Sequence, residues 1–463
     1  MDYDLIIIGS GPGGYVAAIR ASQLKMKVAV VEKAELGGIC LNWGCIPTKS
    51  LLKSAQVYEY VSHASEYGIS IGGEVKPDFK AMVARSRSVA DGMSKGIQFL
   101  FKKNNIIHVK GYGRLAGKNS VEVEDTEGKK ASLTAKNIIL ATGARSKELP
   151  NLKQDGKKII GYREAMTLPA QPSSIVVVGS GAIGSEFANF YQSIGTDVTL
   201  VEFLPRIVPN EDEEVSRQLE RSFKKLKMKI MTDSSVESAD TSKGKCVVTI
   251  RTPKGIETTE ADIVLSAVGV TTNIEEIGLE AAGVKTDRGK IMVDDFYQTS
   301  APGIYAIGDI VHGPALAHVA SAEGIICVEK LAGKDVAPLD YKNIPACTYT
   351  SPEIASVGFT EAAAKEAGYE VKVGKFPFTA SGKASASGAK DGFIKLIFDA
   401  SYGELLGAHM IGAGVTEMIS EIVLARKLET TAHEIIKAVH PHPTMSEAIM
   451  EAAAAAYGEV IHL

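Results

Sequence analysis

The sequence predicts an α/β protein with two similar parallel-sheet domains and a C-terminal α+β domain. Three observations lead to this prediction. An apolar run near the start of the chain leads into a glycine-rich turn and a helical pattern, and the same unit recurs from residue 175. From about residue 344 the pattern changes to short strands followed by helices, without a further turn of this kind.

The first unit has every part of a dinucleotide-binding motif. Residues 4–8 are a β-branched apolar run, residues 9–14 read GSGPGG, and a helical pattern covers residues 15–23. A second apolar strand at residues 28–31 ends on Glu32. In a Rossmann-like domain the glycines let the backbone approach the pyrophosphate, and the acid accepts hydrogen bonds from ribose. A dinucleotide is therefore expected at this turn.

The second unit repeats the first part by part. Residues 175–178 are apolar, residues 179–184 read GSGAIG, and a strand at residues 198–201 ends on Glu202. The first glycine and the acid are 23 residues apart in both units. A repeat that keeps strand, turn, helix and acid in register is much more specific than one short motif. The chain is expected to bind two dinucleotides.

Composition limits the remaining classes of function. The chain has 463 residues, 45% of them hydrophobic, and a net charge of -4, so neither nucleic acid nor an anionic membrane is an expected partner. No apolar stretch reaches the roughly 18 residues of a membrane span, and the first strand begins too near Met1 to leave room for a signal peptide. Five cysteines, an odd number, do not fit a secreted disulfide scaffold. We expect a cytoplasmic protein without a metal site.

Two cysteines, Cys40 and Cys45, lie directly after the first nucleotide motif. On spacing alone they could be buried structural residues, because cysteine often packs as a small hydrophobic side chain. Their place beside a dinucleotide favours a different interpretation, a disulfide that exchanges electrons. Cys246, Cys327 and Cys347 have apolar or strand-like surroundings and are expected to be packing residues.

Residues 440–447, which read HPHPTMSE, are the expected place for proton transfer. A histidine titrates near neutral pH and can accept a proton from a dithiol, while a nearby carboxylate fixes its tautomer and raises its basicity. A dithiol needs such a base because it is mostly protonated at pH 7. From the residues alone, His440 and His442 are both candidates, with Glu447 as the acid.

Changes of pattern set the expected domain boundaries. Apolar strands end on small-residue turns within residues 137–144 and 262–269, and helical patterns cover residues 51–60, 79–102, 416–426 and 445–456. The expected domains are 1–146 for the first nucleotide, 147–271 for the second, 272–343 as a segment completing the first site, and 344–463 as a dimerisation domain.

Taken in order, these motifs resemble those of the flavin-dependent pyridine nucleotide-disulfide oxidoreductases. The resemblance rests on both glycine turns, on GGICLNWGCIPTK at residues 37–49, on the Ala-Thr-Gly at residues 141–143, on Gly308-Asp309, and on HPTMSE at residues 442–447. It covers essentially the whole chain and implies FAD, a redox disulfide and NAD. The branch it most resembles oxidises protein-bound dihydrolipoyl groups. Ile39 and Trp43 depart from the threonine and valine common in relatives.

The resemblance implies a role for each reacting group. Cys40 would exchange with the thiol substrate, and Cys45 would lie against the flavin. His442 would be the base and Glu447 its partner. In this family the histidine comes from the opposite subunit, which implies a homodimer. The implied further partners are lipoyl domains of a 2-oxo acid dehydrogenase or glycine cleavage complex.

The resemblance also implies which residues hold the two cofactors. Lys49 would lie near the reactive edge of the flavin and would pair with Glu186 beneath the nicotinamide. The other residues of the FAD site would be Gly9, Gly11, Gly14, Glu32, Gly37, Gly38, Gly113, Thr142, Gly143, Asp309, Ala317 and His318. Those of the NAD site would be Gly179, Gly181, Gly184, Glu202, Val236 and Gly269.

Two alternatives share most of these features. A glutathione-reductase-like enzyme would use NADPH, whereas the carboxylate of Glu202 would repel a 2'-phosphate and favours NAD. Arg206, four residues on, could oppose that preference. A flavoprotein kept only as a structural subunit would have no need of Cys40, Cys45 and His442.

Overall fold

The computed structural model describes residues 1–463, apart from the side chain of Lys243. The chain forms two compact units. Unit 1 comprises Met1–Leu51, Phe79–Lys147 and Gly269–Leu339, and unit 2 comprises Leu52–Asp78, Glu148–Val268 and Asp340–Leu463.

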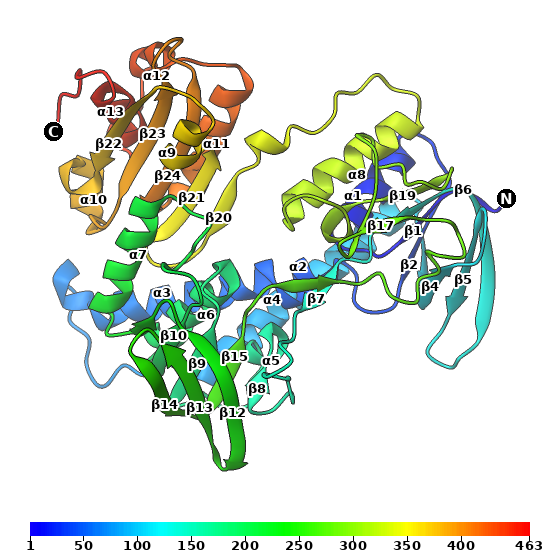
Figure 1. Ribbon diagram of the computed structural model, residues 1–463, viewed down its shortest axis with the longest axis horizontal. Coiled ribbons are helices and arrows are strands. Elements are labelled where there is room, and N and C mark those ends of the chain that lie inside the picture. Colours follow the sequence, from blue (N-terminus) through cyan, green and yellow to red (C-terminus); the bar gives the residue numbers. More distant parts are fainter. The chain divides into compact units, whose positions relative to one another are not determined.

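A seven-stranded sheet forms the centre of unit 1 (Figure 1). Its strands run in the order β3-β2-β1-β6-β5-β4, and β19 also pairs with β6. β1 lies parallel to both β2 and β6, with Ile7 opposite Val30 and Ile139. Residues 5–8 of β1, residues 28–31 of β2 and the last three residues of β6 are buried, which explains the apolar runs at these positions. The bounds are β1 Tyr3–Ile8, β2 Val28–Glu32, β3 Ile107–Lys110, β4 Tyr112–Leu115, β5 Ser120–Glu124, β6 Lys130–Leu140 and β19 Ile304–Ala306.

Two helices of unit 1, α1 and α8, pack closely on each other (Figure 1). A Cβ added at Gly324 would lie 2.8 Å from the carbonyl oxygen of Gly13, so this crossing requires glycine. The helices of the unit are α1 Pro12–Gln23, α2 Gly38–Trp43, α4 Phe79–Lys103, α8 Ala317–Leu331 and the 3-10 turn η2 Gly308–Ile310. Short strand pairs join β7 Ala144–Ser146 to β16 Val270–Thr272 and β17 Thr286–Asp287 to β18 Lys290–Ile291.

Unit 2 contains a second parallel sheet, with strand order β11-β10-β9-β15-β8. Beside it lies an antiparallel sheet of three strands, β12 to β14 (Figure 1). The strands are β8 Ile159–Ile160, β9 Ser174–Val178, β10 Asp197–Val201, β11 Lys229–Met231, β12 Ser235–Lys243, β13 Lys245–Thr252, β14 Gly255–Ala261 and β15 Ile263–Ser266. The helices are α5 Tyr162–Ala165, α6 Ala182–Ser193 and α7 Glu213–Lys225, and an earlier segment adds the 3-10 turn η1 Ala64–Tyr67.

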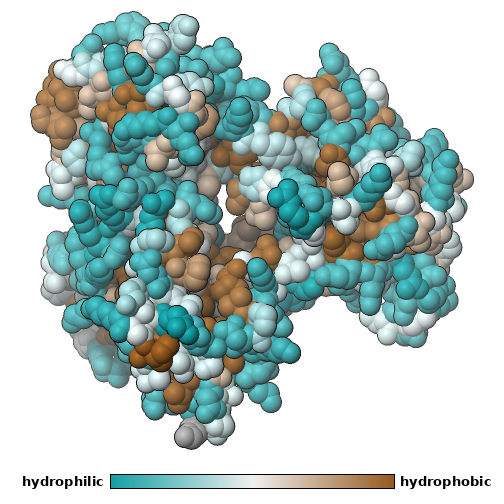
Figure 2. Space-filling model, viewed as in Figure 1, coloured by the Kyte–Doolittle hydropathy of each residue, from teal (hydrophilic) through white to brown (hydrophobic). Residues whose placement is uncertain are grey.

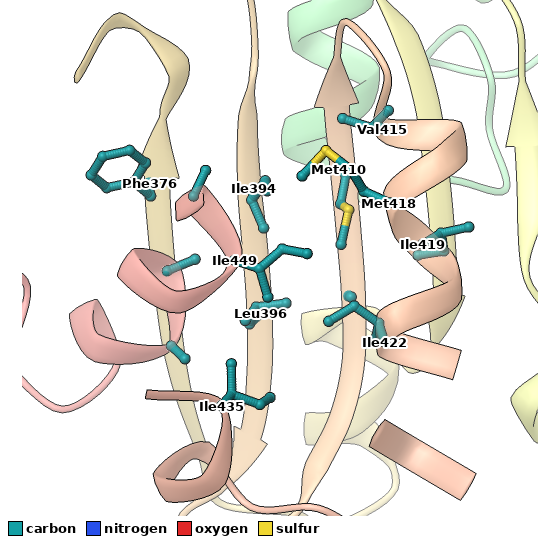
Figure 3. Close-up of a cluster of buried hydrophobic side chains, with 14 of the residues drawn as sticks. Phe376, Ile394, Leu396, Met410, Val415, Met418, Ile419, Ile422, Ile435 and Ile449 are labelled. Atoms are coloured by element: carbon teal, nitrogen blue, oxygen red, sulfur yellow. The ribbon is translucent and has the colours of Figure 1, made fainter. Parts of the chain in front are cut away.

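The C-terminal part of unit 2 is a five-stranded antiparallel sheet covered by helices. Figure 3 shows its core, where Ile394 and Leu396 of the sheet lie beside Ile449. The strands run in the order β20 Ala346–Thr348, β21 Glu353–Gly358, β24 Leu405–Gly412, β23 Phe393–Asp399 and β22 Val371–Pro377. The helices are α9 Glu361–Glu366, α10 Gly382–Ser387, α11 Val415–Lys427, α12 Ala432–Lys437 and α13 Glu447–Ala455, with 3-10 turns η3 Tyr341–Asn343 and η4 Phe378–Ala380.

A buried lysine joins this sheet to α7. Lys395 on β23 is 2% exposed, and its Nζ lies 3.2 Å from Asp212, 3.0 Å from Glu214 and 2.7 Å from Glu361. Burial opposes its charge, but the hydrogen bonds to Glu361 and Glu214 outweigh burial and raise the pKa of Lys395. A buried charge with three ionic partners is costly to disrupt, because removing one partner leaves the others uncompensated.

Most of the expected elements are confirmed, with ends that differ by a few residues and one larger difference. The short strands expected after residue 344 include β21 and β22, and the helix expected at residues 79–102 is α4. The helix expected from residue 51 instead begins at Cys45, as α3 Cys45–Ser62. Pro47 is tolerated there because the first helical turn has no internal N–H partners to lose.

The visible surface is mixed in polarity. In the face visible in Figure 2, hydrophilic residues surround scattered hydrophobic patches. Among the described residues, no helix is long and apolar enough to cross a membrane. The same part of the chain contains no group of His, Cys, Asp and Glu that could hold a metal ion.

Candidate active site

The turn after β1 is built so that backbone surrounds an open space. Gly9 N donates to the carbonyl of Val31 over 2.8 Å. A Cβ at Gly9 would lie 2.2 Å from the carbonyl oxygen of Ala141, and one at Gly14 would lie 2.0 Å from that of Gly9. At Gly11, by contrast, a Cβ would meet nothing within 4 Å. Two glycines therefore permit close packing, and the third faces space that a pyrophosphate could fill.

The acid expected at the end of β2 is held by this turn. Oε2 of Glu32 accepts from Ser10 N over 2.9 Å and from Ser10 Oγ over 2.8 Å. Oε1 accepts from Ala34 N over 2.9 Å. These three hydrogen bonds fix the orientation of the carboxylate. Because Glu32 is also partly exposed, lone pairs remain for the hydroxyl groups of a ligand.

The turn after β9 reproduces this arrangement. Gly179 N donates to the carbonyl of Val201 over 2.8 Å. A Cβ added at Gly179 would lie 2.6 Å from the carbonyl oxygen of Ala267, and a Cβ added at Gly184 would lie 1.9 Å from the carbonyl oxygen of Gly179. A Cβ added at Gly181 would meet nothing within 4 Å. The second turn thus offers the same kind of open space as the first.

Glu202 is held in the same way as Glu32. Its Oε2 accepts from Ser180 N over 2.8 Å and from Ser180 Oγ over 2.6 Å, and its Oε1 accepts from Leu204 N over 2.8 Å. Glu202 is buried, at 7% exposed. Arg206 turns toward its own loop, where Nη2 donates to the carbonyl of Pro209 over 3.4 Å.

Cys40 and Cys45 lie in two consecutive helices. Cys40 belongs to α2, and Cys45 is the first residue of α3, with Gly44 between the helices. Both are thiols in the structure. The hydrogen bond between them raises the pKa of Cys40, burial raises it further, and the positive charge of Lys49 acts in the opposite direction. The three groups that the sequence predicts to interact therefore form one cluster.

Asp309, also in unit 1, lies in η2 at the end of β19. Burial raises the pKa of its carboxyl group, and the charge of Lys290 opposes this effect. Lys290 Nζ donates to the backbone carbonyl of Asp309. A half-buried carboxyl group of this kind is suited to a hydroxyl-rich ligand, whose hydrogen bonds would replace lost water.

The other residues expected at the FAD site have different surroundings. Gly38, with φ +61°, would place a Cβ 2.7 Å from Gly11 Cα, so it adjoins the first turn. A Cβ added at Gly113 would lie 2.9 Å from Val31 Cγ1, which makes Gly113 a packing glycine. Thr142 Oγ1 donates to the carbonyl of Asn273 over 2.6 Å. Gly37 N donates to the carbonyl of Ser10 over 3.1 Å, so this glycine also adjoins the first turn. Gly143 has nothing within 4 Å of an added Cβ, and Ala317 and His318 begin α8, whose N-cap has no side-chain hydrogen bond.

Residues expected around NAD lie along the second turn and its neighbours. Glu186 is buried on α6, and its Oε1 accepts from Tyr349 N over 3.0 Å. The carbonyl of Val236 accepts from Asn151 Nδ2 over 2.8 Å. Gly269, with φ +111°, has no atom within 4 Å of an added Cβ. The expected pairing of Lys49 with Glu186 would join the two units and stays a prediction.

The histidine and acid expected to move protons are in contact in unit 2. Nδ1 of His442 lies 2.9 Å from Oε1 of Glu447, the first residue of α13. Thr444 N donates to Oε2 of the same carboxylate over 2.8 Å. The His442 side chain is 78% exposed. With Nδ1 facing a carboxylate, the proton sits on Nδ1 and the lone pair on Nε2, which is the form a general base needs.

Sequence reasoning missed the two serines that hold the acids. Ser10 and Ser180 are each 0% exposed and each binds its glutamate through both N and Oγ. The signal was present, because both turns read Gly-Ser-Gly. The contact between His440 and Glu421 was also missed, since 19 residues separate them in sequence.

Comparison with protein families and known proteins agrees with this geometry. Residues 3–324 match the model described as pyridine nucleotide-disulphide oxidoreductase, and residues 344–453 match the dimerisation domain of the same group. The chain is 50% identical to a dihydrolipoyl dehydrogenase of Zymomonas mobilis over 99% of both chains, and 49% identical to one of Rhizobium etli over 99% of both.

Solved structures give the same result at the level of the fold. The crystal structure of LpdA from Mycobacterium tuberculosis is similar with a TM-score of 0.91 and 27% identity, covering 97% of this chain and 98% of that one. An HOCl-induced flavoprotein disulfide reductase of Escherichia coli is similar with a TM-score of 0.87 and 24% identity, over 98% of this chain and 99% of its own.

Proposed function

The chain belongs to the pyridine nucleotide-disulphide oxidoreductase family, and from this premise we propose that it oxidises protein-bound dihydrolipoyl groups with NAD as acceptor. The observation that carries the proposal is the hydrogen-bonded pair Cys40 and Cys45, which lies directly after the first nucleotide turn and close enough to Lys49 for the lysine charge to act on Cys40. Two relatives that match 99% of the chain, at 50% and 49% identity, are dihydrolipoyl dehydrogenases.

FAD fits the first turn of the protein. The open space at Gly11, the fixed carboxylate of Glu32 and the uncapped start of α8 supply what a dinucleotide's pyrophosphate, ribose and ring edge require. Asp309 would hold the ribityl hydroxyls. When bound, FAD supplies a two-electron carrier between the dithiol and NAD. In this proposal residues 1–146 and 272–343 form the FAD site, and residues 147–271 form the NAD domain.

NAD fits the second turn, and Glu202 supports its choice over NADP. Both oxygens of the buried carboxylate accept backbone hydrogen bonds, which fix the orientation of Glu202. A 2'-phosphate placed there would face a negative charge, at a cost of several kcal/mol. Arg206 turns to Pro209 in the structure, which weakens the case for Arg206 as a partner of a 2'-phosphate.

The proposed reaction begins with the Cys40–Cys45 disulfide. One thiol of the substrate attacks Cys40 Sγ and gives its proton to Nε2 of His442, so that a mixed disulfide forms and Cys45 leaves as a thiolate. The second substrate thiol then attacks the first substrate sulfur, which closes the lipoyl ring and releases Cys40. Of the two substrate protons, one remains on His442 and one on Cys40, and the negative charge remains on Cys45.

The two thiols and the base are suited to this division of protons. The contact with Cys45 and the burial that raise the pKa of Cys40 favour the protonated form of that residue. Cys45 lies at the first residue of α3, where the positive end of the helix dipole stabilises a thiolate. Glu447 stabilises the imidazolium that His442 becomes.

We further propose that the active site is shared within a homodimer. Residues 344–453 match a dimerisation domain, and the C-terminal part carries His442 and Glu447. In the dimer, the His442 of one chain would serve the dithiol of the other. The proposed further partners are lipoyl domains of a 2-oxo acid dehydrogenase or glycine cleavage complex.

The test is a steady-state assay of the purified yellow protein with dihydrolipoamide and either NAD or NADP. We expect rapid reduction of NAD and little reduction of NADP. Turnover only with NADPH and oxidised glutathione would move the protein to the alternative branch. A flavin-loaded dimer that turns over neither pair would contradict the enzymatic proposal.

A further inference from the structure

His440 lies two residues before His442 but has a different environment. Its Nδ1 is 3.0 Å from the carbonyl oxygen of Ala438, and its Nε2 is 2.9 Å from Oε1 of Glu421. Glu421 lies on α11, whereas Ala438 ends α12. The His440 side chain is only 6% exposed. The ring is therefore clamped between two separate elements.

Both contacts of His440 require the ring to donate. A carbonyl oxygen can only accept a hydrogen bond, and an ionised carboxylate can only accept as well. A neutral imidazole has one N–H, so it could satisfy only one of these two partners. The geometry is therefore that of an imidazolium, with a proton on each nitrogen. The hydrogen bond to Glu421 raises the pKa of His440, while burial opposes it.

His442 shows the opposite arrangement. Only its Nδ1 faces a carboxylate, and the side chain is largely exposed. The ring of His440 thus faces two acceptors, whereas the ring of His442 faces one, which leaves Nε2 of His442 available to accept a proton. The sequence pattern does not distinguish them in this way.

We propose that His440 is a positioning residue, which as an imidazolium ties residues 438–442 to α11 and so holds His442 in place for proton transfer. This inference rests on the proposed function, because it assigns His440 to the same reaction. The link acts through the backbone. His440 holds Ala438 on one side and is followed on the other by Pro441, which restricts the chain before His442.

The clamp has a defined dependence on pH. The charged groups that act on His440 are Glu421 from α11 and Glu447 from α13, and both favour the imidazolium. The pKa of His440 is higher in the folded state than in the unfolded state. The contribution of the clamp to folding stability is therefore complete below the ordinary histidine pKa of about 6.5. It is lost as pH rises through the folded pKa of His440.

The experiment compares His440→Gln and Glu421→Gln with wild type and with His433→Gln, an exposed histidine on α12 that serves as the matched control. Two activities are measured in the FAD-loaded full-length protein. Dihydrolipoamide oxidation needs the base, whereas NADH oxidation by ferricyanide does not involve a substrate thiol. Thermal melting identifies any variant that fails to fold.

We expect both clamp variants to lower kcat for dihydrolipoamide by about 10-fold or more, since displacement of a catalytic group by about 1 Å can cost a factor of about 100. Their ferricyanide rates and the behaviour of His433→Gln should match wild type. The double variant should be no worse than the single ones, because both remove the same contact. Equal losses in both activities, or no loss in either, would overturn the proposal.

A second measurement does not depend on activity. Deuterium exchange at the C2 position of each histidine, followed by mass spectrometry across a pH series, reports individual histidine pKa values. We expect His440 to titrate at a higher pH in wild type than in Glu421→Gln. No difference between the two proteins, or the reverse difference, would overturn the clamp. If the difference is found but wild type does not oxidise dihydrolipoamide, the proposed function fails and the imidazolium assignment stands.

Discussion

The turn at Gly9 and the turn at Gly179 have equivalent backbone hydrogen bonds, and each holds a glutamate through a serine. The segments that follow the two turns differ. After the first, α2 carries Cys40, and α8 packs against α1 through Gly13 and Gly324. After the second, Phe203 is 74% exposed and the chain continues to α7. One fold element thus occurs twice with different neighbours.

The comparison shows which part of a nucleotide site is general and which is particular. The turn and its serine-held acid recognise pyrophosphate and ribose in either unit, so they do not decide whether a nucleotide stays or leaves. We expect the surroundings to decide. The elements around the first turn, α8, η2 and α2, suit a permanently held FAD, whereas the exposed start of the second loop suits a nucleotide that exchanges.

The largest effect is expected at the dithiol, which only the first turn has. Cys45→Ser should lower kcat for dihydrolipoamide oxidation at least about 1,000-fold, because no disulfide can form without Cys45. Cys40 and Cys45 act together, so the loss of one removes the function of both. The same variant should lose the long-wavelength absorption of a thiolate beside a flavin on partial reduction. Cys246→Ser, at a buried cysteine of β13, is the control. Persistence of the band would refute the placement of Cys45.

The two turns can be separated by matching glycine substitutions. Gly14→Ala and Gly184→Ala would each place a Cβ within 2.0 Å of a backbone oxygen. We expect Gly14→Ala to yield protein with little flavin, measured by absorbance at purification. Gly184→Ala should keep its flavin but raise the KM for NAD about 10-fold or more, at a cost of about 1–3 kcal/mol of local strain.

Gly96→Ala is the control for both turn variants, because a Cβ at this helical position meets nothing within 4 Å. It should leave flavin content and KM unchanged. Loss of flavin in Gly184→Ala, or normal flavin in Gly14→Ala, would contradict the assignment of the two turns.

The two acids should also have separable effects. Glu202→Ala should reduce the preference for NAD over NADP about 10-fold to 100-fold, since one like-charge repulsion of a few kcal/mol is removed. Glu32→Ala should weaken FAD binding and leave the NAD to NADP ratio unchanged. The measurement is kcat/KM with each nucleotide. An unchanged ratio in Glu202→Ala would show that another group selects the nucleotide.

The smallest effect is expected on stability, at Glu211 in the loop between β10 and α7. The first unit has no such loop after its glutamate. Burial raises the pKa of Glu211 to about 7, with a smaller contribution from the charge of Asp212, while a hydrogen bond with Ser356 acts in the opposite direction. Between the unfolded pKa of 4.5 and this value the folded state retains a proton that the unfolded state has lost. Stability should therefore fall as pH rises through this window.

Glu211→Gln tests this effect of burial. The variant should melt about 2–5 °C higher than wild type at pH 8 and differ little from it at pH 4.5, where Glu211 is largely protonated in the folded state. Melting curves followed by circular dichroism at both pH values provide the measurement. An equal shift at both values would show that the substitution acts by packing instead.

Much of the fold can be predicted from local patterns, and the exceptions have physical causes. The strands β1, β2, β9 and β10 are predictable because they are largely buried on both faces. Both acids are predictable because they stand at the ends of β2 and β10. Lys395 could not be predicted as a buried residue, since its partner Asp212 is 183 residues away in sequence. The start of α3 at Cys45 was hidden by Pro47, which usually marks the end of a helix.

The candidate site divides in a similar way. Cys40, Cys45 and Lys49 lie within ten residues, so their proximity in the structure was predictable from one segment. The state of His440 was not, because it depends on Glu421 from another helix. Motifs therefore indicate which groups react, whereas the groups that hold them come from distant parts of the chain.

The measurement that tests the central claim most directly is the nucleotide content of the purified protein after exhaustive dialysis. The account predicts about one FAD per chain and almost no NAD, with NAD binding again on addition, because similar turns differ in their surroundings. Retention of both nucleotides, or loss of both, would contradict it, since the two sites would then behave alike.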